Sequence, residues 1–121
     1  MKLIQATLNR LRGCELWAMS NLGPRATGIN VTIFVSPRGR ARHGPRIKVG
    51  QQISKGNLNF SMTISQTPQV VAGQKNVAKI LDAKTLAMVT KWVQKNEKHL
   101  IEFWFGKIQY IEDLLPLLEK V

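Results

Sequence analysis

The sequence predicts an α+β domain, in which a small antiparallel sheet of three to four strands is followed by two or three C-terminal helices that pack against it. Two observations predict this class. Before residue 82, apolar and polar residues alternate with the period of a half-buried strand, whereas after it apolar residues recur every three or four positions, as in an amphipathic helix. With 121 residues, of which 44% are hydrophobic, the chain is long enough for one folded domain.

Four segments carry the pattern of strands. Residues 29–35 (INVTIFV) are rich in β-branched and aromatic side chains, and residues 58–65 show the cleanest alternation. Residues 46–49 alternate basic with apolar side chains, which predicts a half-buried strand with its basic residues exposed. Residues 69–72 predict a short fourth strand before the turn that follows them.

Capping residues divide the second half of the chain into helices. Asp82 is expected to cap a first helix, and Asn96 is expected to cap a second helix that ends at Gly106. A last helix is expected to start near Glu112, because Pro116 then falls in the first turn, where no backbone N–H has an intrahelical partner.

The start of the chain is expected to lie outside this domain. Residues 1–28 predict a basic N-terminal helix or a flexible extension, and the Gly-Pro pair within Asn21–Gly28 predicts a linker. The single α+β domain is therefore expected over residues 29–121.

Several classes of protein are excluded by composition. No apolar run approaches the ~20 residues that span a bilayer, so no membrane segment is expected. Cys14 has no cysteine to pair with, and with only His43 and His99 beside it no zinc site of the Cys/His kind is expected. No acidic cluster suits a two-metal nuclease. We therefore expect no metal and no cofactor, and a cytoplasmic location.

The charge is strongly asymmetric. Residues 1–56 hold ten lysines and arginines against one acid, a net charge of +9, whereas residues 57–121 hold eight lysines and six acids, a net charge of +2. Between Leu16 and Leu81 there is no aspartate or glutamate. Solvated surfaces normally mix the two signs of charge, so this stretch favours an anionic partner over a generic basic surface.

The segment 37–48 concentrates these cations in a glycine- and proline-rich loop and the strand that follows it. Arginine binds phosphate through a planar fork of donors, and glycine lets the backbone approach a ligand closely. The residues expected to bind nucleic-acid phosphates are Arg38, Arg40, Arg42, His43, Arg46 and Lys48. No aromatic platform is expected beside them, because Phe34, Phe60, Trp92 and Trp104 are all assigned to the core.

His43 is the candidate catalytic residue. A neutral imidazole among cations is suited to remove a proton from an RNA 2′-hydroxyl, and the neighbouring arginines would stabilise the charge that develops on the phosphate. This combination predicts a metal-independent ribonuclease as an alternative to simple binding. The other alternative is that His43 only donates a hydrogen bond.

Four short motifs resemble those of a family of small uncharacterised bacterial proteins. The motifs are the strand at 29–35, then HGPRIKV at 43–49, KWVQKN at 91–96 and the Phe-Trp pair at 103–104. Members carry a strand of the form H-x-P-x-I-x-V and are often encoded in toxin–antitoxin-like pairs. The resemblance therefore implies a toxin-like role and a cognate partner.

The resemblance covers roughly residues 29–110, and the first 28 residues lie outside it. In that family the strand often carries further histidines where this chain has Arg46 and Lys48. This departure weakens a histidine-based catalytic role and fits phosphate binding better.

Three functions remain open from the sequence. The first is a nucleic-acid-binding protein that binds the phosphates of RNA or DNA, as the toxin-like member of a toxin–antitoxin or phage-defence pair. The second is the ribonuclease that uses His43. The third is a protein-interaction or inhibitor module whose basic loop docks on an acidic partner. The open edges of a small sheet also make a dimer conceivable.

Overall fold

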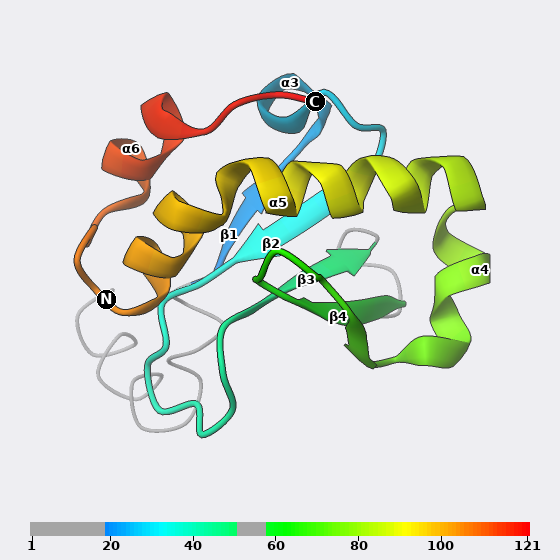
Figure 1. Cartoon of the computed structure of the whole chain (residues 1–121), viewed down its shortest axis with the longest axis horizontal. Coiled ribbons are helices and arrows are strands. Elements are labelled where there is room, and N and C mark those ends of the chain that lie inside the picture. Colours follow the sequence, from blue (N-terminus) through cyan, green and yellow to red (C-terminus); the bar gives the residue numbers. More distant parts are fainter. Residues whose placement is uncertain (1–18, 51–57) are drawn as a thin grey trace, which may run out of the picture.

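A computed structural model of the chain describes residues 19–50 and 58–121 (Figure 1). It contains a five-stranded antiparallel sheet followed by helices, which confirms the α+β class with a strand count slightly higher than predicted. The strands lie in the order in which they occur along the chain. They are β1 (Ser20–Leu22), β2 (Thr32–Val35), β3 (Arg46–Gly50), β4 (Asn59–Thr63) and β5 (Val70–Ala72).

The register of the strands gives the sheet two chemically different faces. Ile33 pairs with Val49, which pairs with Phe60, and all three are fully buried in the hydrophobic core. Because successive side chains of a strand point to opposite faces, the adjacent row projects from the other face. That row contains Phe34, Lys48 and Ser61, paired in the same way.

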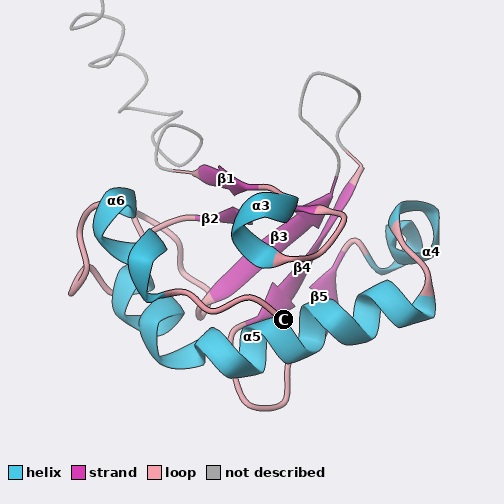
Figure 2. Ribbon diagram, turned by 90° about the horizontal axis from the view of Figure 1, so that it is seen from above, coloured by secondary structure: helices cyan, strands magenta, loops and turns pink. Residues whose placement is uncertain are grey.

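One long helix, α5 (Ala83–Trp104), packs against the apolar face of the sheet (Figure 2). Its side chains Val89, Trp92 and Val93 belong to the same core cluster as the strand residues. As predicted, Asp82 caps it, and the side chain of Asp82 accepts a hydrogen bond of 2.8 Å from the backbone N–H of Thr85.

The predicted division of α5 into two helices is wrong. Asn96 lies in the middle of α5 and is almost fully buried. Its polar side chain is satisfied there by hydrogen bonds with the backbone of both Trp92 and Glu119. No glycine or proline interrupts the helix there, so nothing in the backbone requires it to end. The helix does stop before Gly106, whose φ of 83° is the left-handed conformation common after a helix C-terminus.

The C-terminal segment is less helical than predicted. It forms α6 (Ile111–Leu114) and a 3₁₀ turn, η3 (Leu115–Leu117), which contains Pro116. The tail that follows runs to the segment between the first two strands, where the backbone N–H of Val121 donates to the carbonyl of Thr27 at 3.2 Å. This hydrogen bond joins the C-terminal tail to a segment near the start of the described residues.

The predicted linker at Asn21–Gly28 is wrong. These residues contribute β1 and a short helix, α3 (Pro24–Thr27), and β1 pairs with β2. Leu22 joins the hydrophobic core, so the sheet begins before the expected boundary at residue 29. The remainder of the predicted N-terminal extension, residues 1–18, lies outside the described residues, as does Cys14.

The other strand predictions are confirmed with small shifts of their ends, except that the strand expected at 29–35 begins only at Thr32. Between β5 and α5 the chain forms a 3₁₀ turn, η2 (Gln74–Asn76), and α4 (Val77–Ile80). Among the helices of the described ranges, none has the length and apolar character needed to cross a membrane.

Candidate functional site

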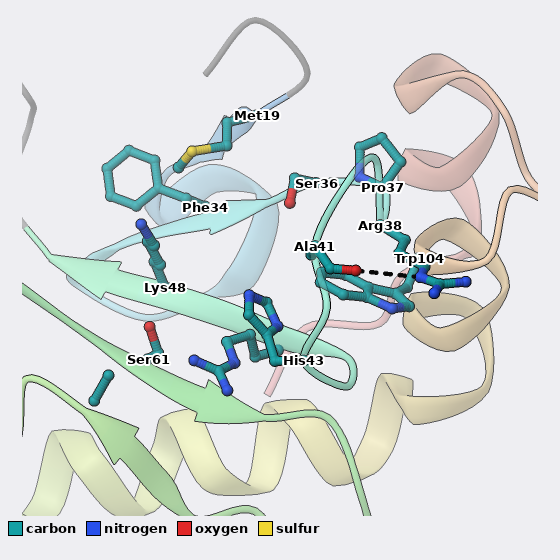
Figure 3. Close-up of a pocket in the computed structure, with 12 residues that line it drawn as sticks. Met19, Phe34, Ser36, Pro37, Arg38, Ala41, His43, Lys48, Ser61 and Trp104 are labelled. Atoms are coloured by element: carbon teal, nitrogen blue, oxygen red, sulfur yellow. Dashed lines mark hydrogen bonds between the residues drawn. The ribbon is translucent and has the colours of Figure 1, made fainter. Parts of the chain in front are cut away.

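A pocket of about 270 Å³ lies on the sheet face opposite α5 (Figure 3). Its floor is one row of the sheet that crosses four neighbouring strands. Phe34 of β2 pairs with Lys48 of β3, Lys48 with Ser61 of β4, and Ser61 with Ala72 of β5. Arg46 precedes Lys48 by two residues, so it projects from the same face and also lines the pocket.

The loop between β2 and β3 forms one wall of this pocket and is fastened to the end of α5. The backbone N–H of Arg38 donates to the carbonyl of Trp104 at 2.7 Å, and the N–H of Ala41 donates to the carbonyl of Arg38 at 2.9 Å. The carbonyl of Trp104 belongs to the last turn of α5, where carbonyls lack intrahelical partners. The loop thus supplies a hydrogen-bond donor to a carbonyl at the end of α5, and the same contact places Arg38 and Ala41 at the pocket.

His43 packs on Trp104 at the rim of the pocket. The centroids of their rings are 5.6 Å apart, and the ring planes are inclined by 35°. The Nδ1 atom of His43 lies 2.9 Å from the carbonyl oxygen of Gly44. A carbonyl oxygen only accepts hydrogen bonds, so Nδ1 is the donor, and in a neutral ring the lone pair is then on Nε2. The exposed imidazole therefore offers a proton-accepting nitrogen that its own loop does not use.

The cations of the pocket have no acidic neighbour among its described lining residues. Among the described residues that line it, four carry basic side chains and none is acidic. In the described parts of the chain, the ion pairs are those of Glu102 with His99 and Lys107, which are not pocket residues. The half-buried Arg46 also has a buried Nε with no hydrogen-bond partner among the described residues. A buried donor of this kind gains free energy when an acceptor reaches it.

The structure brings together four of the six residues predicted to bind phosphate. Arg38, His43, Arg46 and Lys48 line the pocket, whereas Arg40 and Arg42 stand on the exposed part of the loop and do not line it. Glycine at position 39 adopts a φ of 55° in the turn between Arg38 and Arg40.

Two aromatic residues that the sequence assigns to the core are buried, as predicted, and also line the pocket. Phe34 and Trp104 are buried, but neither belongs to the core cluster and both line the pocket. The strand pattern contained the signal for Phe34: if Ile33 and Val35 face the core, the residue between them must face the other way. No local signal exists for Trp104, because its position depends on where the loop docks. Phe60 and Trp92 do lie in the core, as predicted.

Within the described residues, the other ionisable groups do not form a second site. His99 binds Glu102 at 3.0 Å, and this hydrogen bond holds the pKa of the Glu102 carboxyl below its usual value. Within the described residues, no three histidine, cysteine or acidic side chains gather in a group able to hold a metal ion. A second hollow beside Pro24 and Ile80 is lined by uncharged residues among those described.

Comparison of the chain with protein-family models, with curated proteins and with solved structures finds no match. The chemistry of the pocket is therefore the basis for the functional conclusion.

Proposed function

We propose that this protein binds the phosphate backbone of a nucleic acid, RNA or DNA, through the pocket face of its sheet. One observation carries the proposal: Arg38, Arg46 and Lys48 converge on a single pocket that contains no carboxylate among the described residues. Cations held close together without counter-charges repel one another, and a polyanion that reaches them removes this repulsion.

The kind of cation supports phosphate in particular. The guanidinium of Arg46 presents donors in a planar fork, and its buried Nε has no partner among the described residues. A phosphate oxygen is a strong acceptor and would supply that partner. Arg40 and Arg42 stand on the exposed loop beside the pocket, where they would extend the positive surface along a polymer.

The salt dependence of binding tests the proposal. If four side chains contact phosphates, the logarithm of the binding constant falls with the logarithm of salt with a slope of about −3 to −4. Fluorescence anisotropy with a labelled oligonucleotide between about 50 and 300 mM salt measures this slope. No binding to RNA or DNA at about 50 mM salt removes the proposal.

A matched pair of double variants locates the contacts. Arg46→Ala with Lys48→Ala removes two pocket cations and should reduce the slope by about 1.5 to 2. Lys91→Ala with Lys98→Ala removes the same charge from exposed positions of α5 and should leave the slope within error of the parent. Equal losses for both pairs would mean that net charge, and not the pocket, is responsible.

A role as the toxin-like member of a two-protein pair is supported by the sequence resemblance and by the unbalanced cations that an acidic partner would neutralise. Induced expression should then slow growth of a bacterial host, and the Arg46→Ala, Lys48→Ala variant should not. Growth that is equally slow with both proteins would remove the pocket from this role.

One observation favours a second candidate function, a metal-independent ribonuclease. Because Nδ1 of His43 donates to Gly44, the free nitrogen Nε2 has the lone pair that a general base needs. It would take the proton of a 2′-hydroxyl, whose oxygen then attacks the adjacent phosphorus, and the 5′-oxygen leaves with a proton from water. The products would be a 2′,3′-cyclic phosphate and a 5′-hydroxyl.

The cleavage test compares His43→Ala with the parent protein on an RNA oligonucleotide and on the same oligonucleotide with one 2′-deoxy sugar. His43→Ala should abolish cleavage and change binding by no more than a few-fold, and the 2′-deoxy linkage should resist the parent protein. Cleavage retained by His43→Ala rejects the role of this residue.

A further inference from the structure

The pocket differs from a simple basic patch because half of its lining is apolar. Six of its twelve described lining residues are apolar: Met19, Phe34, Pro37, Ala41, Ala72 and Trp104. Phosphate recognition alone needs no such walls, since phosphates are bound by charge and hydrogen bonds at the surface. The apolar part of the lining therefore indicates a ligand with a flat or apolar portion next to its charge.

We infer that the pocket receives one unpaired nucleotide of a single strand, with the base against the apolar walls and its phosphate on Arg46 and Lys48. This inference rests on the proposed function and names its substrate class. Bases in a duplex are stacked and paired, so they cannot enter a concave pocket, whereas the bases of a single strand can be splayed out and enclosed.

The size of the pocket fits this ligand. Its volume of about 270 Å³ lies just below the roughly 300–1,000 Å³ of typical small-molecule sites. One nucleotide is among the smallest ligands that combine an aromatic plane with a phosphate. The pocket is too small for a folded peptide or for several stacked bases.

The walls are held in place before any ligand arrives. Phe34 and Trp104 are only 4% and 3% exposed, and Trp104 carries the hydrogen bond that fastens the loop. His43 packs on Trp104 and is itself exposed, so a base that enters the pocket can reach its ring. On the floor, the hydroxyl of Ser61 lies beside Lys48 in the same sheet row and offers a donor and an acceptor to a base edge.

The experiment uses the full chain and three probes at one salt concentration: a ten-nucleotide thymidine oligomer, a duplex of equal length, and a ten-residue abasic strand. The inference predicts that the thymidine oligomer binds at least about tenfold more tightly than the duplex or the abasic strand, from the contribution of an enclosed and stacked base.

Two variants fill the pocket without changing its charge. Ala41→Trp adds bulk from the loop, and Ala72→Leu adds it from β5 on the other side. Each should reduce binding of the thymidine oligomer about tenfold or more and leave the abasic strand within a factor of two. The matched control, Ala87→Trp, places the same side chain on the exposed surface of α5 and should change neither.

The outcomes separate the two proposals. Failure of all three probes to bind removes the proposed function itself. Equal binding of all three probes, unchanged by Ala41→Trp and by Ala72→Leu, overturns the single-nucleotide inference and leaves backbone binding in place. Tighter binding of the duplex than of the single strand also overturns it.

An NMR titration provides an independent readout that does not require a variant to fold. Thymidine monophosphate should shift the indole N–H signal of Trp104 and the amide of Ser61, whereas inorganic phosphate at the same concentration should shift neither by a comparable amount. Equal shifts with both probes would mean that the base does not enter the pocket.

Discussion

Asn96→Ala should release the C-terminal tail from α5 and destabilise the whole domain. The Nδ2 group of Asn96 donates to the carbonyls of Trp92 and Glu119, both at 2.9 Å, and its Oδ1 accepts from the N–H of Glu119 at 2.7 Å. The two bonds to Glu119 connect residues 23 positions apart, and the Asn96 side chain is almost fully buried. Alanine can replace none of these bonds.

The expected loss follows from the number of bonds and their burial. Each hydrogen bond is worth about 1 kcal/mol net, and a partly buried donor or acceptor left without a partner costs about 1–3 kcal/mol. The carbonyl of Trp92 accepts within the helix in any case, so only the two bonds to Glu119 count fully. We expect the free energy of unfolding to fall by about 2–3 kcal/mol.

Urea denaturation followed by circular dichroism measures this change, with Lys95→Ala as the matched control. Lys95 is the neighbouring residue and also binds the tail, since its Nζ donates to the carbonyl of Lys120 at 2.8 Å, but this bond is exposed. Lys95→Ala should therefore cost less than about 0.5 kcal/mol. Native-state hydrogen exchange should show faster exchange at the amide of Glu119 in Asn96→Ala. A loss below 0.5 kcal/mol for Asn96→Ala, with unchanged exchange at that amide, would refute the reasoning.

Three further predictions concern stability. Gly73→Ala should cost more than about 2 kcal/mol in urea denaturation, because Gly73 has a φ of 73° and a Cβ there would lie 2.5 Å from the carbonyl oxygen of Asn59. The matched control is Gly23→Ala, whose Cβ meets nothing within 4 Å and which should change the free energy of unfolding by less than about 0.5 kcal/mol. Trp92→Phe should cost about 1–3 kcal/mol, because the smaller ring leaves a cavity in the core, whereas the indole N–H that it removes has no partner among the described residues and adds no further cost. A loss above about 4 kcal/mol in urea denaturation would contradict this reasoning. The pKa of Asp82 is lowered by its hydrogen bonds with Thr85, so its contribution to stability is fully present above the usual value of 3.8 and is lost as the pH falls through the lower folded-state pKa. Urea midpoints measured from pH 5 to pH 2 should fall less steeply for Asp82→Asn than for the parent, and identical profiles would contradict this assignment.

The alternation of side chains was enough to predict the central strands, because one buried face imposes a period of two on the sequence. The same reasoning missed β1, since Ser20–Leu22 is too short to show a period and precedes a Gly-Pro pair typical of loops. Asn96 was misplaced for a different reason. An asparagine between two apolar stretches resembles a cap, and only the return of the tail, more than 20 residues later, gives its side chain a buried partner.

The candidate site was also predicted only in part. Its cations were predicted from the sequence because they are concentrated within 37–48, and charge asymmetry is visible without a fold. Its walls were not predicted, because Trp104 meets His43 only after the loop has docked on the end of α5. The sequence also does not separate the arginines that line the pocket from those that do not, since this depends on the path of the loop.

The pairing of Lys48 with Phe34 and Ser61 also determines how the sheet assembles. A slip of β3 by one residue against its neighbours would exchange the two faces, so that Lys48 would enter the core and Val49 would face water. Burying an unpaired ammonium costs far more than one strand pairing contributes. The side chains that form the pocket floor therefore also disfavour a shifted register of the strands. Replacing Lys48 with an apolar residue would lower the free-energy cost of that shifted register during folding.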